Sequence, residues 1–191
     1  MEWFPKYNYI LASKSPRRQQ LLNSLGIEFK VQLKEVEEKF PDNLSMEEIP
    51  VYLAKLKAAP FLAELKENDL LITADTIVSF NKKVLGKPSD YEDAKQMLAG
   101  LSGNEHQVIS GVCLTSEKKQ TSFYSSSNVQ FKVLSDKEIE YYISKFKPLD
   151  KAGAYGIQEW IGAVGITHIE GSFYNVMGLP IQKLYEEVQK F

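Results

Sequence analysis

One apolar stretch constrains the fold more than any other part of the chain. Residues 70–80 read Leu-Leu-Ile-Thr-Ala-Asp-Thr-Ile-Val-Ser-Phe, a pattern typical of a strand that is buried within a sheet. A carboxylate, Asp75, stands in the middle of this run. Burial of an ionised carboxylate is costly unless the group is paired, hydrogen-bonded, metal-bound or open to a cleft. We therefore expect Asp75 to belong either to a structural ion pair or to a catalytic or metal-binding site.

A second stretch, residues 9–22, predicts a short buried strand, a polar loop and a helix. Ser15 suits the N-cap of that helix, so Arg17 and Arg18 fall in its first turn. The N-terminus of a helix carries partial positive charge, and two arginines there are favourable only if an anion joins them. The pattern therefore predicts a phosphate site in which Ser13, Ser15 and both guanidiniums surround an oxyanion. The alternative is that both arginines point into water.

Composition narrows the class of protein. The 191 residues are enough for one sizeable domain, and their ordinary composition argues against disorder. The net charge of −2 provides no broad positive surface, so we expect no nucleic-acid partner and no membrane partner. The single cysteine, Cys113, excludes an internal disulfide and is expected to be buried. No apolar run reaches about 18 residues and no signal peptide is evident, so we expect a cytoplasmic protein.

Helices interspersed with long strands predict a mixed sheet in an α/β fold. Capping boxes predict helices that start at Ser45-Met-Glu-Glu48, Ser89-Asp-Tyr-Glu92 and Ser135-Asp-Lys-Glu138. The other expected elements are a strand over 29–33, a hairpin turn at 81–83, strands over 106–116 and 121–133, a hairpin of 164–169 with 173–177, and a helix from Ile181.

Two groups of charged residues in the first half of the chain are candidates for a site. Glu35, Glu37 and Glu38 follow the strand at 29–33, and such a cluster is either a solvated loop or a ligand set for a divalent metal. Lys57 lies at the edge of the apolar stripe of the helix that follows. From there its side chain either extends into solvent or reaches over a cleft.

Two later segments add further candidates. The predicted hairpin returns the chain so that Lys87 is expected near Asp75. Asp150 and Lys151 stand beside Gly153, where the missing side chain allows the backbone to approach a ligand closely. The alternative for this last segment is an ordinary turn.

Cations and carboxylates therefore interleave along the chain, a composition suited to binding polyphosphate and metal. Cleavage of a phosphoanhydride requires cations that neutralise the non-bridging oxygens and a divalent ion held by carboxylates. It also requires a base that positions water. The members of this charged set are Arg17, Arg18, Glu38, Lys57, Asp75, Lys87, Asp150 and Lys151.

The order and spacing of five segments resemble the motif set of the Maf family. The segments are Leu11-Ala-Ser-Lys-Ser-Pro-Arg-Arg18, Ala74-Asp-Thr76, Gly86-Lys-Pro88, Leu101-Ser-Gly103 and Asp150-Lys-Ala-Gly-Ala-Tyr-Gly-Ile-Gln158. The resemblance spans nearly the whole chain and implies a single Maf-like domain over residues 1–191. It implies an α/β fold like that of inosine triphosphate pyrophosphatase, with an elongated mixed sheet flanked by helices and a central cleft between two lobes.

The resemblance also implies an activity. Maf proteins hydrolyse the α–β phosphoanhydride of a nucleoside triphosphate, which yields the monophosphate and pyrophosphate. The family is linked to nucleotide house-cleaning, septum formation and arrest of cell division, and its members are often homodimers. A divalent cation, Mg²⁺ or Mn²⁺, is the expected cofactor. The alternative is a regulator of septum formation that binds a nucleotide without turnover.

Roles carry over to this chain by position within the motifs. Asp75 resembles the proton acceptor of the family, and Glu38 resembles its acidic metal-site position. We expect the metal to be held by Glu38 and Asp75. The positions that resemble phosphate ligands are Ser13, Arg17, Lys57 and Lys87. Asp150 and Lys151 are further candidates for the same cleft.

Three positions concern the choice of base. Arg18, Thr76 and Gln158 match the branch of the family that prefers dTTP and UTP over the branch that acts on 7-methyl-GTP. The carbonyl of the Gln158 amide can accept from N3–H of uracil or thymine while its NH₂ group donates to an adjacent carbonyl. The alternative is that Gln158 only braces its loop and that pocket size sets the choice of nucleotide.

Overall fold

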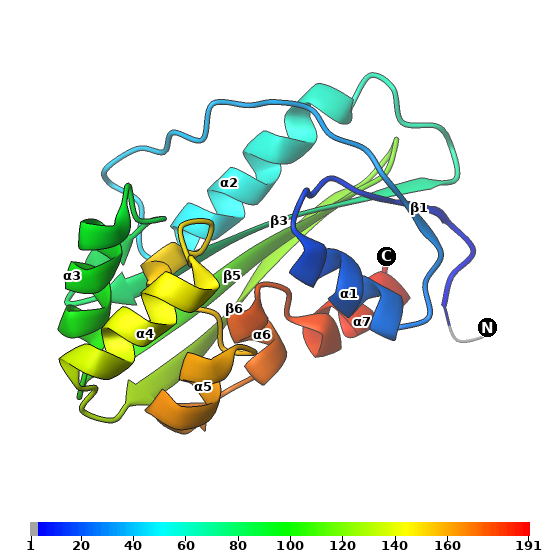
Figure 1. Cartoon of the computed structure of the whole chain (residues 1–191). Helices are drawn as coiled ribbons and strands as arrows, with labels where there is room; N and C mark the ends of the chain where they lie inside the picture. Colours follow the sequence, from blue (N-terminus) through cyan, green and yellow to red (C-terminus); the bar gives the residue numbers. More distant parts are fainter. Residues whose placement is uncertain (1–3) are drawn as a thin grey trace. The chain divides into compact units, whose positions relative to one another are not determined.

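The strands form one mixed sheet in the order β2-β1-β3-β5-β6-β7, with β4 paired to β3 (Figure 1). The computed structural model describes residues 4–191. Its strands are β1 (Asn8–Leu11), β2 (Phe29–Val31), β3 (Asp69–Phe80), β4 (Lys83–Leu85), β5 (Glu105–Thr115), β6 (Gln120–Phe131) and β7 (Ile166–Glu170). Its helices are α1 (Pro16–Ser24), α2 (Glu48–Ala58), α3 (Tyr91–Leu101), α4 (Asp136–Phe146), α5 (Trp160–Gly165), α6 (Phe173–Met177) and α7 (Ile181–Gln189), with 3₁₀ turns η1 (Ala59–Phe61) and η2 (Ala152–Ala154). The predicted mixed α/β fold is confirmed.

The described chain divides into two compact units. Unit 1 comprises the described part of Met1–Thr76 together with Ser110–Ser125 and Gly178–Phe191. Unit 2 comprises Ile77–Ile109 and Ser126–Met177. The expectation of one Maf-like domain with a central cleft stays a prediction. Across residues 4–191, no helix combines the length and the apolar character that crossing a membrane requires.

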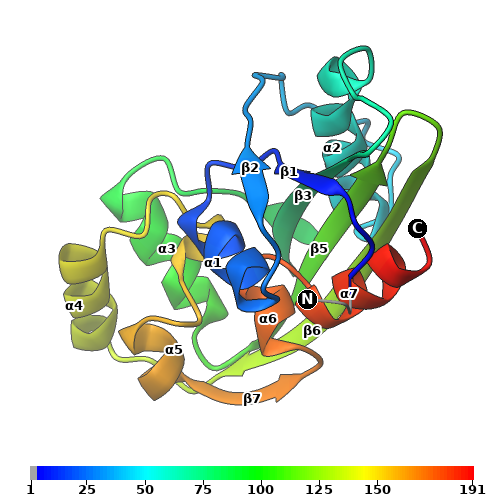
Figure 2. The same ribbon diagram turned by 90° about the vertical axis from the view of Figure 1, so that its right-hand side faces the viewer.

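Unit 1 is built on parallel pairing of β1 with both β2 and β3. Tyr9 is opposite Phe29 on one side and Leu70 on the other. Figures 1 and 2 show α2 on one side of these strands and α7 on the other. A buried apolar cluster joins α2 and η1 to the sheet, and its members are Ile10, Ala54, Ala58, Phe61, Leu65, Leu71 and Cys113. The burial expected for Cys113 is therefore confirmed.

Side chains along β3 alternate between the two faces of the sheet, and this alternation determines which of them contact α2. Leu71 belongs to the apolar cluster against α2, and the Thr73 hydroxyl donates to the backbone oxygen of Ala54 at 2.7 Å. Because alternate side chains of a strand share a face, Asp75 points to the same side as Leu71 and Thr73. Thr76 follows on the opposite face.

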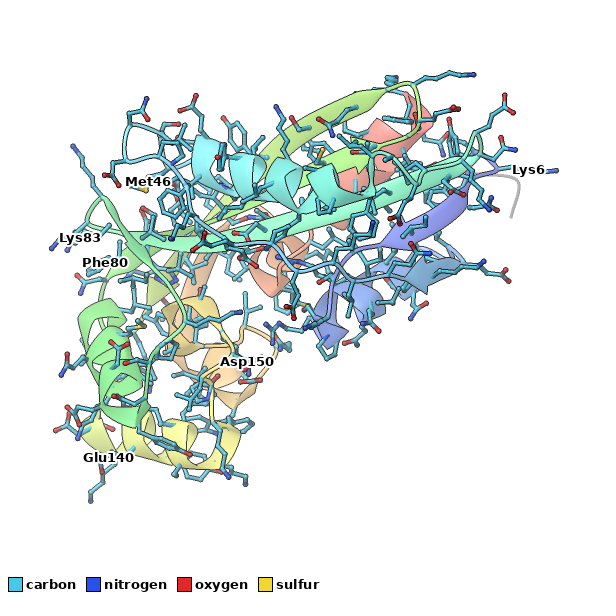
Figure 3. All side chains as sticks on the ribbon, turned by 90° about the horizontal axis from the view of Figure 1, so that it is seen from above. Lys6, Met46, Phe80, Lys83, Glu140 and Asp150 are labelled. Carbon is cyan, nitrogen blue, oxygen red and sulfur yellow. The ribbon has the colours of Figure 1, made fainter. Side chains whose placement is uncertain are left out.

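Unit 2 contains the hairpin of β3 with β4 and the antiparallel pair of β6 with β7. Val78 is opposite Leu85, and Phe80 and Lys83 lie together at the turn (Figure 3). The hairpin predicted at residues 81–83 is therefore confirmed. The capping box at Ser135 is also confirmed, since its hydroxyl accepts from Glu138 N while the Glu138 carboxylate accepts from Ser135 N.

The predicted hairpin of residues 164–169 with 173–177 is wrong. The first segment forms β7, which pairs with β6, and the second forms the short helix α6. Ser172 helps start this helix because its hydroxyl accepts from Asn175 N at 3.4 Å. A short apolar run fits a strand or a helix equally well, and here the local cap and the tertiary contacts decide.

Several boundaries also differ from the expectation. Helix α3 begins one residue later than predicted, because Asp90 rather than Ser89 is the N-cap and its side chain accepts from Asp93 N. Strand β2 ends at Val31 instead of Leu33, and β6 ends at Phe131 instead of Val133. These differences lie at element ends, which fray and are less regular than element interiors.

The close approach of α2 to β5 gives a test of packing in unit 1. A Cβ at Gly111 would lie 2.3 Å from the backbone C of Pro50 and the backbone N of Val51. We expect Gly111→Ala to lower the free energy of unfolding by about 3 kcal/mol, at the upper end of typical overpacking costs. Urea unfolding followed by circular dichroism measures this change.

Gly100→Ala is the matched control for this substitution. Gly100 lies in α3, and an added Cβ there meets no atom within 4 Å. Alanine is favoured over glycine in a helix by about 0.5–1 kcal/mol, so the control should be neutral or slightly stabilising. Equal unfolding midpoints for the two variants would contradict the packing described here.

Candidate functional site

The buried carboxylate of unit 1 is paired with a lysine. Lys57 Nζ of α2 lies 2.6 Å from Asp75 Oδ1 and 3.1 Å from Glu38 Oε2. The side chains of Lys57 and Asp75 are 16% and 12% exposed, whereas that of Glu38 is 53% exposed. One ammonium group therefore joins a buried carboxylate to one at the surface, which supplies the partner that burial of Asp75 requires.

Local sequence signals place Lys57 for this contact. The capping box predicted at Ser45 is present, since Ser45 N donates to Glu48 Oε2 at 2.8 Å and Glu48 N donates to Ser45 Oγ at 3.3 Å, but the regular helix α2 begins later than predicted, at Glu48. Lys57 falls in the last turn of α2, where the negative end of the helix dipole favours a cation. Of the two placements that the sequence left open for Lys57, extension into solvent is wrong, because the ammonium is held in an ion pair.

The acidic cluster before α2 separates into two kinds of residue. Glu35 and Glu37 make surface ion pairs with Lys14 at 3.9 Å and with Lys39 at 2.5 Å, so they fit the solvated-loop interpretation. Glu38 instead reaches Lys57 and lies in the same cluster as Asp75. Of the three, Glu38 is the residue that fits a functional interpretation.

Arg18 makes hydrogen bonds to three protein acceptors in unit 1. Its Nε donates to Gly178 O at 2.8 Å, one terminal nitrogen donates to Ala74 O at 2.9 Å, and the other donates to Thr76 Oγ1 at 3.0 Å. Burial lowers the pKa of the Arg18 guanidinium, and the charges of Asp75 and Glu38 act in the opposite direction. These contacts show that Arg18 does not point into open water, and its predicted part in an oxyanion site stays a prediction.

The bond from Arg18 to Ala74 continues the hydrogen bonding along the edge of β3. Backbone pairing with β1 ends where Ala12 N donates to Ile72 O at 3.0 Å. The next carbonyl on that edge belongs to Ala74, and it accepts from the Arg18 side chain. Arg18 therefore holds both residues that flank Asp75 in the sequence.

The loop before α1 follows the predicted pattern. Ser15 Oγ accepts from Arg18 N at 3.4 Å, which confirms Ser15 as the N-cap. Ser13 is buried, and its hydroxyl accepts from Ser15 N at 3.2 Å. Arg17 is half-buried in the first turn. These residues stay predicted phosphate ligands.

Unit 2 brings together two of the predicted site segments. Gly153 N donates to Gly86 O at 3.0 Å, so the segment that carries Lys87 lies against the segment that carries Asp150 and Lys151. Gly153 requires its lack of a side chain, since its φ is +66° and a Cβ would lie 3.1 Å from Val78. Lys87, Asp150 and Gln158 are exposed, and their predicted roles in substrate binding stay predictions.

Tyr142 and Glu159, two members of a buried polar network that also includes Lys151, are absent from the candidates predicted from the sequence. The Tyr142 hydroxyl donates to Glu159 Oε2 and accepts from Gly156 N, and Glu159 Oε1 is paired with Lys151 Nζ. Tyr142 lies on the apolar face of α4, where periodicity marks it only as a core residue. The one available signal was the position of Glu159 directly after Gln158.

A second buried pair in unit 2 stabilises the same segment. His106 Nε2 and Tyr155 Oη are 2.7 Å apart, and the His106 ring stacks on Phe131 at 5.5 Å between centroids. Burial lowers the pKa of His106 to about 4, so this imidazole is neutral at pH 7. We therefore treat the pair as structural support for the loop.

The two carboxylates of this cluster, Glu38 and Asp75, fit a metal ion that is also bound by the phosphate oxygens of a substrate. Among the described residues, no group of three or more His, Cys, Asp or Glu side chains is placed to hold a metal ion. Glu38 and Asp75 nevertheless converge on one point, which Lys57 Nζ occupies. Mg²⁺ is commonly bound by one or two carboxylates and completes its shell with phosphate oxygens and water. Glu38 and Asp75 match that pattern.

Comparison with known proteins identifies the family. The model of the Maf-like protein family matches residues 8–191. The chain belongs to the Maf family. A relative from Bacteroides thetaiotaomicron named dTTP/UTP pyrophosphatase is 54% identical over 97% of this chain and 96% of its own length. A relative of the same name from Phocaeicola vulgatus is 54% identical over 100% of this chain and 99% of its own.

Solved structures support the same fold at low sequence identity. The Staphylococcus aureus Ham1 protein matches this Maf protein with a TM-score of 0.54 and 15% identity, covering 96% of this chain and 98% of its own. A HAM1 protein from Coxiella burnetii matches with a TM-score of 0.51 and 14% identity, covering 97% of this chain and 100% of its own. The predicted fold class is therefore confirmed.

The Asp75 cluster of this Maf protein generates a test of catalysis. Asp75→Asn keeps the shape of the side chain but removes its basicity, and a general base contributes about 10²- to 10⁴-fold to the rate. We expect kcat for nucleoside triphosphate hydrolysis to fall within about that range. Pyrophosphate release measures turnover, and circular dichroism checks the fold.

Asp69→Asn is the control on the same strand. Asp69 lies at the start of β3, where its carboxylate accepts from Asn8 Nδ2 and Lys66 N. The control should keep normal turnover. A correctly folded Asp75→Asn variant with near-normal kcat would show that Asp75 is not the base.

Proposed function

We propose that this Maf protein is a nucleoside triphosphate pyrophosphatase that hydrolyses dTTP and UTP to the monophosphate and pyrophosphate. The observation that carries the proposal is the buried Asp75 carboxylate, held at 2.6 Å by Lys57 beside Glu38. The relatives that share half of its sequence and are named dTTP/UTP pyrophosphatase support the choice of substrate.

Asp75 supplies the base in this proposal. It accepts a proton from the water that attacks the α-phosphorus, and pyrophosphate leaves as the P–O bond to the β-phosphate breaks. Lys57 orients the carboxylate through its bond to Oδ1. Arg17, Lys87 and Ser13 complete the set that binds phosphate oxygens, because guanidinium, ammonium and hydroxyl groups donate to them.

A divalent cation held by Glu38 and Asp75 completes the proposed site. Glu38 and Asp75 would hold the ion, which would supply positive charge to offset that of the phosphate groups. Lys57 contacts both carboxylates, so its ammonium would have to give up part of this contact where the ion binds. Mg²⁺ and Mn²⁺ are the candidates because carboxylate and phosphate oxygens suit both.

Gln158, Thr76 and Arg18 are proposed to govern the choice of base. The Gln158 side chain is exposed and therefore available to a ligand. Thr76 and Arg18 are bonded to each other and to Gly178, so they act in this proposal by fixing local geometry. The expected homodimer, the cytoplasmic location and a role in septum formation stay predictions.

The alternatives account for fewer observations. A nucleotide-binding regulator without turnover requires no general base, so it gives Asp75 no role beyond the ion pair with Lys57. A 7-methyl-GTP pyrophosphatase binds a positively charged base, which aromatic or acidic side chains recognise better than a neutral amide. The names of the relatives also favour dTTP and UTP.

A substrate panel tests the proposed specificity. We expect the highest kcat/KM for dTTP and UTP among dTTP, UTP, CTP and 7-methyl-GTP. Gln158→Ala should reduce this preference, since an unpaired polar group in the complex costs about 1–3 kcal/mol. If 7-methyl-GTP is the best substrate, the proposed specificity is wrong although pyrophosphatase activity remains.

Metal removal tests the cofactor. Excess EDTA should reduce pyrophosphate release to background, and added Mg²⁺ or Mn²⁺ should restore it. Glu38→Gln should raise the metal concentration needed for half-maximal activity about tenfold, equivalent to about 1.4 kcal/mol of binding free energy. Glu35→Gln, in the same acidic segment but paired with Lys14, is the control and should leave the metal requirement unchanged. Full activity in EDTA would refute the metal requirement.

A further inference from the structure

The segment that carries Gln158 is fixed to helix α4 by one hydroxyl group. Tyr142 is fully buried, and its hydroxyl accepts from Gly156 N at 3.0 Å and donates to Glu159 Oε2 through a very short hydrogen bond. Burial, and then the bond to Glu159, raise the pKa of Tyr142. The hydroxyl therefore stays protonated at neutral pH and remains a donor to the carboxylate.

The Glu159 carboxylate is also in contact with a lysine in the same network. Lys151 Nζ lies 3.2 Å from Glu159 Oε1 and 2.7 Å from Asp150 Oδ1. The side chains of Lys151 and Glu159 are only 9% and 19% exposed, so this ion pair is largely removed from water, whereas Asp150 is exposed. The backbone around Gln158 is thus anchored at Lys151, Gly156 and Glu159.

Gly156 brings the Gln158 amide beside the Glu159 carboxylate. A Cβ at Gly156 would lie 2.9 Å from Glu159 Cδ and 3.2 Å from Gln158 Nε2. Glu159 Oε2 lies 3.1 Å from the same point, so both side chains lie over this glycine and the amide nitrogen of Gln158 is turned toward it. The carboxylate attracts the NH₂ group and repels the carbonyl oxygen, so the carbonyl oxygen is directed away from Glu159.

The orientation of this amide determines which pyrimidine it can recognise. Uracil and thymine present an N3–H donor beside a carbonyl oxygen, whereas cytosine presents an N3 acceptor beside an amino donor. Rotation of a glutamine amide by half a turn exchanges its donor and its acceptor. A glutamine that turns freely therefore pairs with either base, and only a fixed glutamine discriminates between them.

We propose that Tyr142 and Glu159 are positioning residues for base selection, which hold the Gln158 amide in the orientation that accepts from N3–H and rejects cytosine. This inference rests on the proposed function, in which Gln158 contacts the base. Neither Tyr142 nor Glu159 contacts the substrate in it. Tyr142 fixes the Glu159 carboxylate, and the carboxylate fixes the amide.

The ratio of kcat/KM for UTP to that for CTP tests the inference. These nucleotides share ribose and triphosphate and differ at the base edge, so a loss of folded protein lowers both values equally and leaves their ratio unchanged. Tyr142→Phe removes only the hydroxyl. Glu159→Gln keeps an acceptor for Tyr142 but removes the charge that orients the amide. We expect each variant to reduce the UTP/CTP ratio at least about tenfold, with CTP hydrolysis retained or increased.

Tyr141→Phe is the matched control. Tyr141 is the preceding residue on α4, is 42% exposed, and accepts a surface hydrogen bond from Lys145. Its variant should keep the wild-type ratio within about twofold. Amide hydrogen exchange adds a second measurement, because Tyr142→Phe removes the acceptor of Gly156 N–H and should accelerate exchange at that amide.

Gln158→Ala separates the two possible failures. If Gln158→Ala lowers the ratio but Tyr142→Phe and Glu159→Gln do not, the positioning inference is overturned and the proposed function stands. If Gln158→Ala keeps the wild-type ratio, Gln158 does not select the base, and both the specificity proposal and the inference fail. If Tyr142→Phe does not fold, Glu159→Gln alone decides between these outcomes.

Discussion

The contact between Lys57 and Asp75 is the interaction on which the rest of unit 1 depends. It places a charge inside an otherwise apolar strand, and that arrangement is tolerable only because an ammonium lies 2.6 Å away. To deliver that ammonium, α2 has to pack closely on β5, which explains the glycine at position 111. The ion pair between Lys57 and Asp75 therefore depends on the close packing of α2 on β5.

The two faces of strand β3 carry side chains with different roles. Asp75 points toward α2 and carries the charge, whereas Thr76 points to the other side and is held by Arg18, Ser110 and Gly178. The alternation of side chains places a reactive group and a rigid support on adjacent residues of the same strand. The backbone on both sides of Asp75 is thereby fixed before any ligand binds.

Much of this arrangement could be predicted from the sequence because its signals are local. The buried strand, the N-cap at Ser15 and the capping boxes at Ser45 and Ser135 are each specified by a few consecutive residues. The partners of Arg18 and of the Tyr142 hydroxyl lie far away in the chain, and periodicity does not report where a polar atom at the end of a side chain points. Helix α6 was predicted as a strand because its five residues are too few to show whether apolar side chains recur with the period of a helix or of a strand.

The bond from Arg18 to Ala74 also has a consequence for where the first strand can stop. Ala74 is fully buried, and a backbone carbonyl left without a partner there would cost about 1–3 kcal/mol. The guanidinium binds that carbonyl beyond the point where backbone pairing with β1 ends. Arg18 therefore allows β1 to stop short of Asp75 without leaving a buried acceptor unsatisfied.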